Sequence, residues 1–368
     1  MVVPREAIST VTFIDNYCSV YRDLFADVRS FEAFKFLHLG MISEIPRKSL
    51  PAISRAVNLP NDQVLHHSLT ESPWSVTELR KRRLDAILQQ LNGQTITLVI
   101  DETGDRKKGR TTDYVARQYI GNLGKIENGI VSVNAYGIVG QLTFPLLFKV
   151  FKPKHRLKAE DVYQTKLQLA QSIVEEIVAF GFKIELVLAD SLYGESHPFV
   201  RLLDRLELPW IVAIRSNHGV WMPEDEAVEY IDWQRFERVF SDGSTEERYI
   251  QEMIFGRRLQ WRYWTLTNDP VALPDNSTWQ VMSHLKGKRD HFDQIGNLYG
   301  LRTWIEYGFK QCKDQLGWAD YRVTHYVQIE RWWEIVSSAY LMVSLQFWGL
   351  RGKPPAVLDE DQLNLLTR

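Results

Sequence analysis

The run TITLVI, at Thr95–Ile100, is followed directly by Asp101. A second run of the same kind, IELVLA at Ile184–Ala189, is followed by Asp190. Short runs that are apolar throughout and rich in β-branched residues predict strands that are buried on both faces of a sheet. If the two strands are neighbours, their carboxylates lie together, and a third carboxylate from a helix would complete a site for divalent metal ions.

The elements around these two strands indicate how the sheet is ordered. Three strands come first, then a helix, a strand, a helix and a last strand. The predicted ranges, in chain order, are Thr95–Ile100, Gly129–Val139, Leu142–Phe151, Ala159–Phe180, Ile184–Ala189, Pro198–Leu206 and Trp210–Ile214. A three-strand meander followed by αβαβ is the order of the RNase H fold, so we predict an α/β protein with an RNase H-like mixed five-stranded sheet and helices. In that fold the first and fourth strands are neighbours, which would place Asp101 and Asp190 side by side.

The remaining segments predict a multidomain chain. Residues 1–92 are expected to form a helical, DNA-binding domain, in which Leu50–Leu69 predicts two short helices across a tight turn. Such a pair is either a helix-turn-helix that reads DNA or part of a helical bundle without a ligand. Residues 93–216 are expected to form the first part of the catalytic core, 217–295 a β-rich insertion, 296–350 the second part of the core with its catalytic helix, and 351–368 a C-terminal tail.

The third carboxylate is predicted within YGLRTWIEYGFKQCK, at Tyr299–Lys313. At roughly 100° per residue, Tyr299, Arg302, Glu306 and Lys313 fall within about 60° of one another on a helix. One helical face would then present a phenol, a guanidinium, a carboxylate and an ammonium group. The alternative is a solvated face with an ordinary Arg–Glu pair at i, i+4.

The composition is that of an ordinary globular protein. The chain has 368 residues, 45% hydrophobic and 24% charged, and a formal net charge of −2. Its two cysteines have neither zinc-site spacing nor the density of a secreted disulfide scaffold. The start lacks signal-peptide features, and the apolar stretch Val336–Leu350 is too short to span a bilayer. We therefore expect a cytoplasmic, nucleoid-associated bacterial protein that does not bind membranes.

Three motifs together resemble those of a known family. DETGDRKKG (Asp101–Gly109), LADSLYG (Leu188–Gly194) and the pattern Y-x2-R-x3-E-x6-K from Tyr299 to Lys313 resemble the DDE transposases of bacterial insertion sequences, specifically the IS701 relatives in the IS4-like group. The resemblance implies an RNase H-like domain in which Asp101, Asp190 and Glu306 are catalytic and bind two Mg²⁺ ions, with Mn²⁺ as a substitute. It also implies cut-and-paste cleavage at transposon ends and strand transfer into target DNA, with a DNA hairpin as one route of excision.

The same resemblance implies how double-stranded DNA is bound. The partners are the terminal inverted repeats and the target DNA, held by a homodimer that pairs two ends. Tyr299, Arg302 and Lys313 would hold a terminal phosphate, and the basic residues Arg106, Lys107 and Lys108 of a flexible loop would contact the DNA backbone. In the insertion, Trp264 is expected to stack on a flipped base, with Tyr263 as second choice and core packing of Trp264 as the alternative.

Three other functions are compatible with parts of the sequence. One is an RNase H-like nuclease that cuts but does not join, and another is a non-catalytic DNA-binding derivative of a transposase. The third is a P-loop-like NTPase, because Gly104, Gly109 and Thr111 have the spacing G-x4-G-x-T. Against it, Arg110 replaces the essential lysine, and Asp105 would lie inside the phosphate cradle.

Overall fold

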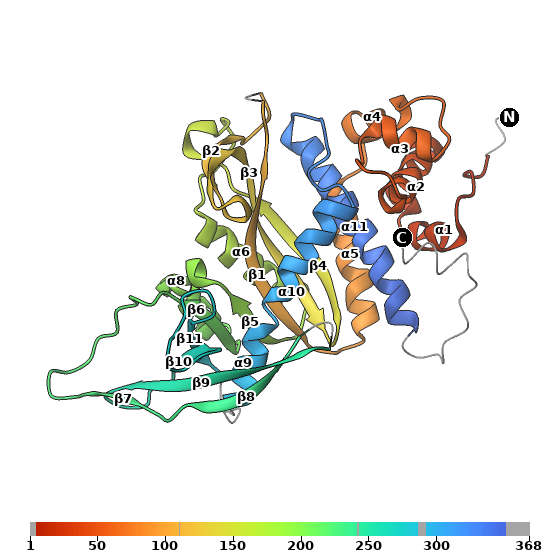
Figure 1. Ribbon diagram of the computed structural model, residues 1–368. Helices are drawn as coiled ribbons and strands as arrows, with labels where there is room; N and C mark the ends of the chain where they lie inside the picture. Colours follow the sequence, from red (N-terminus) through yellow and green to blue (C-terminus); the bar gives the residue numbers. More distant parts are fainter. Residues whose placement is uncertain (1–4, 110, 241–242, 286–291, 351–368) are drawn as a thin grey trace. The chain divides into compact units, whose positions relative to one another are not determined.

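The computed structural model describes residues 5–109, 111–240, 243–285 and 292–350. They form two compact units, which are each described separately below (Figure 1). The sheet unit contains Gly93–Arg106 and Gln118–Tyr307, and the helical unit contains the residues up to Asn92, Lys107–Arg117 and the residues from Gly308 on. The expected C-terminal tail, 351–368, lies outside the described residues.

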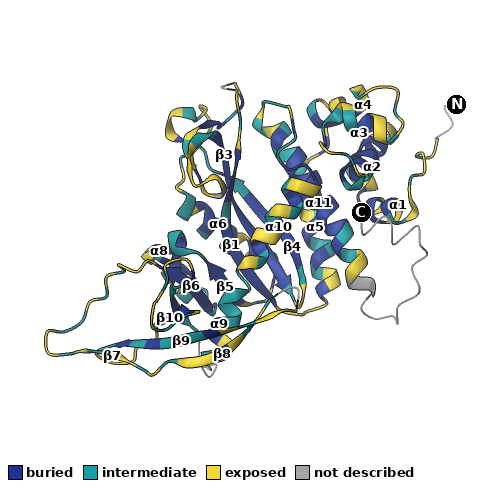
Figure 2. Cartoon of the chain, viewed as in Figure 1, coloured by how far each residue is buried: buried dark blue, intermediate teal, exposed yellow. Residues whose placement is uncertain are grey.

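The sheet unit is built on five strands: β1 (Ile96–Arg106), β3 (Lys125–Val139), β4 (Leu142–Val150), β5 (Ile184–Ala189) and β6 (Trp210–Ile214). β3 pairs antiparallel with both β1 and β4. β5 pairs in parallel with β1 on one side and with β6 on the other. The expectation that the first and fourth predicted strands are neighbours is therefore confirmed. Figure 2 shows β1 and β3 as largely buried, and the apolar runs within both strands account for much of this burial.

The long helix of the sheet unit is α6 (Lys166–Phe180). It begins at a capping box between Thr165 and Gln168 and ends at Gly181, whose φ of 102° suits a residue without a side chain. The prediction placed its start seven residues too early, at Ala159. Its apolar stripe is buried, which accounts for its packing against β3 and β4. The second predicted helix is α8 (His197–Arg205), one residue from its predicted position at both ends.

β1 is longer than predicted and does not end at Asp101. It continues to Arg106 because β3 is long enough to pair with it as far as Gly129, and Thr103 and Asp105 are buried. Residues 104–106 therefore belong to a strand, which corrects the expected flexible loop. A P-loop is also wrong, because it needs a loop and then a helix, whereas an additional strand, β2 (Ala116–Ile120), follows here.

The insertion does not form a separate sheet. Its strands are β7 (Val228–Tyr230), β8 (Gln234–Val239), β9 (Thr245–Phe255), β10 (Arg262–Thr267) and β11 (Trp279–His284). β11, which was not predicted, pairs antiparallel with β6, and β10 and β9 follow in order. The described strands thus form one eleven-stranded sheet, which corrects the expectation of a five-stranded sheet interrupted by an insertion.

The expected catalytic helix is broken into pieces. α9 (Phe292–Gly300) ends just before Leu301 and Arg302, which lie in a turn, and α10 (Thr303–Lys310) follows. A π-helical turn, Gln311–Gln315, contains Lys313. A single helical face shared by all four predicted residues is therefore wrong.

The helical unit contains α1 (Thr12–Ser19), a 3-10 turn (Arg22–Leu24), α2 (Val28–Ile42), α3 (Leu50–Ala56), α4 (Gln63–Thr70), α5 (Val76–Leu91) and α11 (Tyr326–Leu350). The two short helices predicted within Leu50–Leu69 are confirmed as α3 and α4. α11 packs against α2, α4 and α5. For this reason the residues from Gly308 on group with the N-terminal helices, whereas 296–350 were expected to group with the catalytic core. Among the residues described, no helix is long and apolar enough to cross a membrane.

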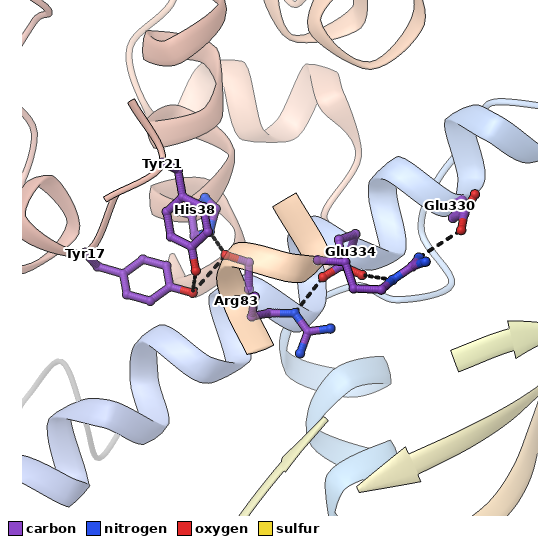
Figure 3. A network of polar contacts seen from close by, with 8 residues as sticks. Tyr17, Tyr21, His38, Arg83, Glu330 and Glu334 are labelled. Atoms are coloured by element: carbon purple, nitrogen blue, oxygen red, sulfur yellow. Dashed lines mark hydrogen bonds and ion pairs between the residues drawn. The ribbon is translucent and has the colours of Figure 1, made fainter. Parts of the chain in front are cut away.

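Buried polar contacts join α11 to the N-terminal helices (Figure 3). Glu334 accepts from Arg83 Nε at 2.6 Å and Arg80 Nε at 3.0 Å, and the side chains of Arg83 and Glu334 are both fully buried. The imidazole of His38 on α2 lies 2.9 Å from the hydroxyl of Ser338, which also lies 2.9 Å from the phenol of Tyr17. Buried charges are costly unless paired, so loss of either partner of the Arg83–Glu334 pair would leave a buried charge uncompensated.

Candidate active site

Asp101 and Asp190 are brought together by the parallel pairing of β1 and β5. Ile100 and Ala189 are cross-strand partners, so the two aspartates follow at equivalent positions of neighbouring strands. Asp101 is buried within β1, where its other neighbour across the sheet is Asn134. Asp190 follows β5 and caps the short helix α7 (Ser191–Gly194) by accepting from the Leu192 amide at 2.9 Å.

Gly194 allows α7 to lie directly against β6. A Cβ atom at this position would be 1.8 Å from the carbonyl oxygen of Ala213. Only glycine fits such an approach of two backbones. Asp190 caps the start of α7, so we expect this contact to help position the Asp190 carboxylate.

The two aspartates lie in an environment that disfavours their negative charge. Burial and, after it, the charge of the nearby Asp190 raise the pKa of Asp101 to about 7, against the opposing effect of Arg302. Burial also raises the pKa of Asp190, although Arg302 and backbone amides oppose it. Two carboxylates this close cannot both ionise cheaply without added positive charge.

Arg302 links the third predicted acid to this pair. Its Nη1 donates to Asp101 Oδ2 at 3.0 Å, and its Nη2 donates to Glu306 Oε1 at 3.0 Å. Glu306 lies on α10 and is exposed, whereas the Asp101 side chain is only 12% exposed. Both carboxylates therefore lie within hydrogen-bond reach of one guanidinium group.

Tyr299 is also part of this cluster. It lies at the end of α9, and burial raises the pKa of its phenol to about 12, with Asp190 and Asp101 adding to the rise and Arg302 opposing it. The phenol therefore keeps its proton at neutral pH and can act as a hydrogen-bond donor.

Two further residues of the cluster were missed in the sequence. Lys166, the first residue of α6, donates to Glu102 Oε1 at 2.9 Å, and its charge opposes the rise in the pKa of Asp190. Tyr193 is fully buried on α7, where burial and the charges of Asp101, Glu102 and Asp190 raise the pKa of its phenol. Tyr193 lies within the LADSLYG motif and could have been selected from it, whereas no local pattern pointed to Lys166.

The remaining predicted DNA contacts are divided between the two units. Arg106 ends β1 and pairs with Glu127 at 3.6 Å. Lys107 belongs to the helical unit, where it donates to the Ala319 carbonyl at 2.9 Å and lies over the ring of Tyr321. Lys108 and Lys313 belong to the helical unit as well, and Lys108 is exposed.

Trp264 does not present its ring to DNA. Its side chain is fully buried on β10, and its indole donates to Ser283 Oγ at 2.8 Å. Phe292 of α9 packs edge-on against it, with ring centroids 5.5 Å apart. The predicted base-stacking role of Trp264 is therefore wrong, because the face of β10 that carries it is covered by α9.

The donors of this site suit a divalent cation. Carboxylate oxygens are the ligands that Mg²⁺ prefers, and the raised pKa values of Asp101 and Asp190 indicate a deficit of positive charge. Within the described part of the chain, however, no three His, Cys, Asp or Glu side chains are arranged around one point that could hold a metal ion. The guanidinium of Arg302 lies between two of the donors.

Comparisons with known proteins identify the family of this chain. A family model described as "DDE superfamily endonuclease" matches residues 22–237, and one described as "Transposase DDE domain" matches residues 160–342. The "Probable transposase for insertion sequence element IS701" of Microchaete diplosiphon is 56% identical over 331 residues, which are 90% of this chain and 87% of the relative. Among solved structures, the NurA nuclease from Sulfolobus solfataricus aligns with 61% of this chain and 81% of its own at 10% identity, with a TM-score of 0.22, which is too low to support an argument about the fold. The chain belongs to the DDE transposases, and within them to the IS701 type.

Proposed function

We propose that this enzyme cleaves DNA at the ends of its insertion sequence and joins them to target DNA, with Asp101, Asp190 and Glu306 as the catalytic acids. The observation that carries the proposal is the convergence of these residues: β1 and β5 pair in parallel, and Arg302 contacts both Asp101 and Glu306. The strand order β4-β3-β1-β5-β6 supports an RNase H-like catalytic core.

DDE transposases generally use divalent metal ions. We infer two Mg²⁺ ions here, with Mn²⁺ as a substitute, held by Asp101, Asp190 and Glu306. When bound, such ions activate a water or a 3′-hydroxyl and stabilise the leaving oxygen of an in-line displacement. The protein supplies a buried position for Asp101, a half-buried one for Asp190 and an exposed one for Glu306, through which DNA can reach the site.

Arg302 and Tyr299 are suited to bind a terminal DNA phosphate. A guanidinium offers a planar pair of donors for phosphate oxygens, and the protonated phenol of Tyr299 offers another. Lys313, Arg106 and Lys108 remain proposed contacts to the DNA backbone, with Lys107 more closely engaged by Ala319 and Tyr321.

The partners in this reaction are the terminal inverted repeats, the target DNA and a second copy of the chain that holds the other end. The insertion also exposes an aromatic side chain, since Trp221 is 86% exposed. Stacking of a base on an exposed aromatic ring is worth about 1–3 kcal/mol, so Trp221 replaces Trp264 as the proposed stacking residue.

The proposal is tested by incubating the protein with Mg²⁺, a duplex of the terminal repeat that flanks its reading frame, and a supercoiled target. Asp101→Asn, Asp190→Asn and Glu306→Gln should each lose cleavage by orders of magnitude while still binding the duplex. The matched control is Glu185→Gln, an exposed carboxylate at the opposite end of β5 from Asp190, which should behave like the wild type.

The products separate the alternatives. Joined end–target molecules support a transposase, and cleaved ends without joining indicate a nuclease that does not transfer strands. Binding of the duplex without any cleavage indicates a non-catalytic derivative. Near-normal cleavage by any of the three acid variants would show that its residue is not a catalytic acid.

A further inference from the structure

Arg302, which is proposed to bind a DNA phosphate, is instead paired with two carboxylates of the protein. It lies in the turn between α9 and α10, and its guanidinium donates at 3.0 Å both to Asp101 and to Glu306. Its side chain is only 21% exposed. The guanidinium thus pairs with two of the three acids that are proposed to hold metal ions.

These ion pairs compete with metal binding. Both carboxylate oxygens of Asp101 already accept hydrogen bonds. Oδ2 accepts from Arg302, and Oδ1 accepts from the Glu102 amide at 2.7 Å. A guanidinium and a divalent cation at the same oxygens also repel each other. Full coordination of a metal ion by these carboxylates therefore requires that Arg302 leave them.

A DNA phosphate can remove this competition. Its oxygens match the planar donors of arginine as well as a carboxylate does. Because Arg302 lies in a two-residue turn, its side chain can reorient without unwinding a helix, since α9 ends at Gly300 and α10 begins at Thr303. Exchange of the guanidinium from carboxylate to phosphate would free Asp101 and Glu306 together.

We propose that Arg302 is a latch that keeps the acids from binding metal fully until a DNA end is bound. The proposal rests on the proposed function and deepens it, by coupling DNA binding to metal binding. Such coupling is reciprocal, so the duplex should tighten metal binding by the same factor by which metal tightens duplex binding. Premature cleavage of unpaired or unrelated DNA would thereby be limited.

The test measures Mn²⁺ affinity, from the electron paramagnetic resonance signal of free Mn²⁺, with and without the terminal-repeat duplex. In the wild type, the duplex should tighten Mn²⁺ binding on the order of tenfold, within the usual range of coupling between sites. Without DNA, Arg302→Ala and Arg302→Gln, the second of which keeps more of the side-chain volume, should bind Mn²⁺ about tenfold more tightly than the wild type. Adding the duplex should tighten their Mn²⁺ binding little further. Both variants should cleave more slowly, because the phosphate contact is lost.

The control is Arg258→Ala, which removes one arginine from Glu252 but leaves Arg262 paired with it at 2.7 Å. It should leave Mn²⁺ affinity unchanged. Unchanged or weaker Mn²⁺ binding by folded Arg302→Gln would overturn the latch and assign Arg302 to positioning of Glu306 instead. A failure of the proposed function is distinguishable, because Asp101→Asn would then bind Mn²⁺ in the presence of the duplex as tightly as the wild type does.

Discussion

Replacing Gly194 by alanine tests how closely the position of Asp190 depends on backbone packing. The new Cβ would lie 1.8 Å from the Ala213 carbonyl oxygen, whereas real Cβ contacts are essentially never under 3.0 Å. α7 and β6 must then separate by at least 1.2 Å, the difference between these two distances. The nearest clashing atoms belong to the Ala213 backbone and not to a flexible side chain, so the backbone must take up the shift, and we expect it to reach Asp190 at the start of α7.

Two consequences of this shift can be measured. Overpacking of a core contact costs about 1–3 kcal/mol in the free energy of unfolding. A misplacement of about 1 Å at a reacting group costs on the order of 100-fold in rate. Gly194→Ala should therefore lower the thermal midpoint and, at a temperature where the protein is still folded, reduce cleavage of the terminal-repeat duplex about 100-fold.

A matched control lies in the loop that follows β6. A Cβ added to Gly219 would meet no atom within 4 Å, so Gly219→Ala should melt and cleave like the wild type. If Gly194→Ala is indistinguishable from Gly219→Ala in both measurements, the contact between α7 and β6 does not hold Asp190 in place.

Three other predictions concern buried ionisable side chains. Glu334→Gln leaves the buried Arg83 without its carboxylate and should lower the free energy of unfolding by about 3–5 kcal/mol, whereas Asp23→Asn, in an exposed pair, should change it by less than about 1 kcal/mol in urea titrations. Burial lowers the pKa of His38 to about 4 from 6.5, so as the pH falls the unfolded chain takes up a proton before the folded protein does. The free energy of unfolding should therefore fall as the pH drops from 6.5 toward 4, by up to about 1.4 kcal/mol per pH unit. His38→Gln should remove this part of the pH dependence. Burial raises the pKa of Asp101 to about 7 from 3.8, so without bound metal its ionisation lowers stability as the pH rises through this range. Asp101→Asn should therefore raise the thermal midpoint at pH 8 in a chelating buffer, and this gain should vanish at about pH 4. A midpoint at pH 8 that is equal to or lower than that of the wild type would contradict the cost assigned to burying this carboxylate.

Much of the catalytic sheet could be predicted from local pattern because its strands are short and apolar. TITLVI and IELVLA have no helical period, and their order along the chain indicates which strands are neighbours. The extent of β1 could not be predicted in this way. DETGDR is polar and contains Gly104, and only its pairing with the long strand β3 keeps it extended.

The structure brings Asp101, Asp190 and Arg302 close to one another, but not in the helical geometry that the sequence predicts. The spacing of Tyr299, Arg302 and Glu306 fits one helical face. The helix, however, ends at Gly300, and the three residues come from two helices and the turn between them. Trp264 shows the opposite error. Strand alternation indicates that two faces of β10 exist, but only the tertiary packing of Phe292 decides that the face with Trp264 is covered.

The pairing of β11 with β6 has a consequence for how this enzyme can change over evolutionary time. Ile214 and Gln280 are direct cross-strand partners, so the chain leaves the core and returns to it at points about 5 Å apart. The segment between them, residues 215–279, begins and ends at neighbouring points of the sheet. Its length can therefore change without changing the spacing of Asp190 and Glu306 in the sheet unit. Closing a longer excursion costs only about 0.6 kcal/mol for each doubling of its length. Its strands β8, β9 and β10 contact α9, which carries Tyr299, so they must be kept. Its loops are therefore the place where a designer could graft a new DNA-contacting arm without disturbing the proposed site.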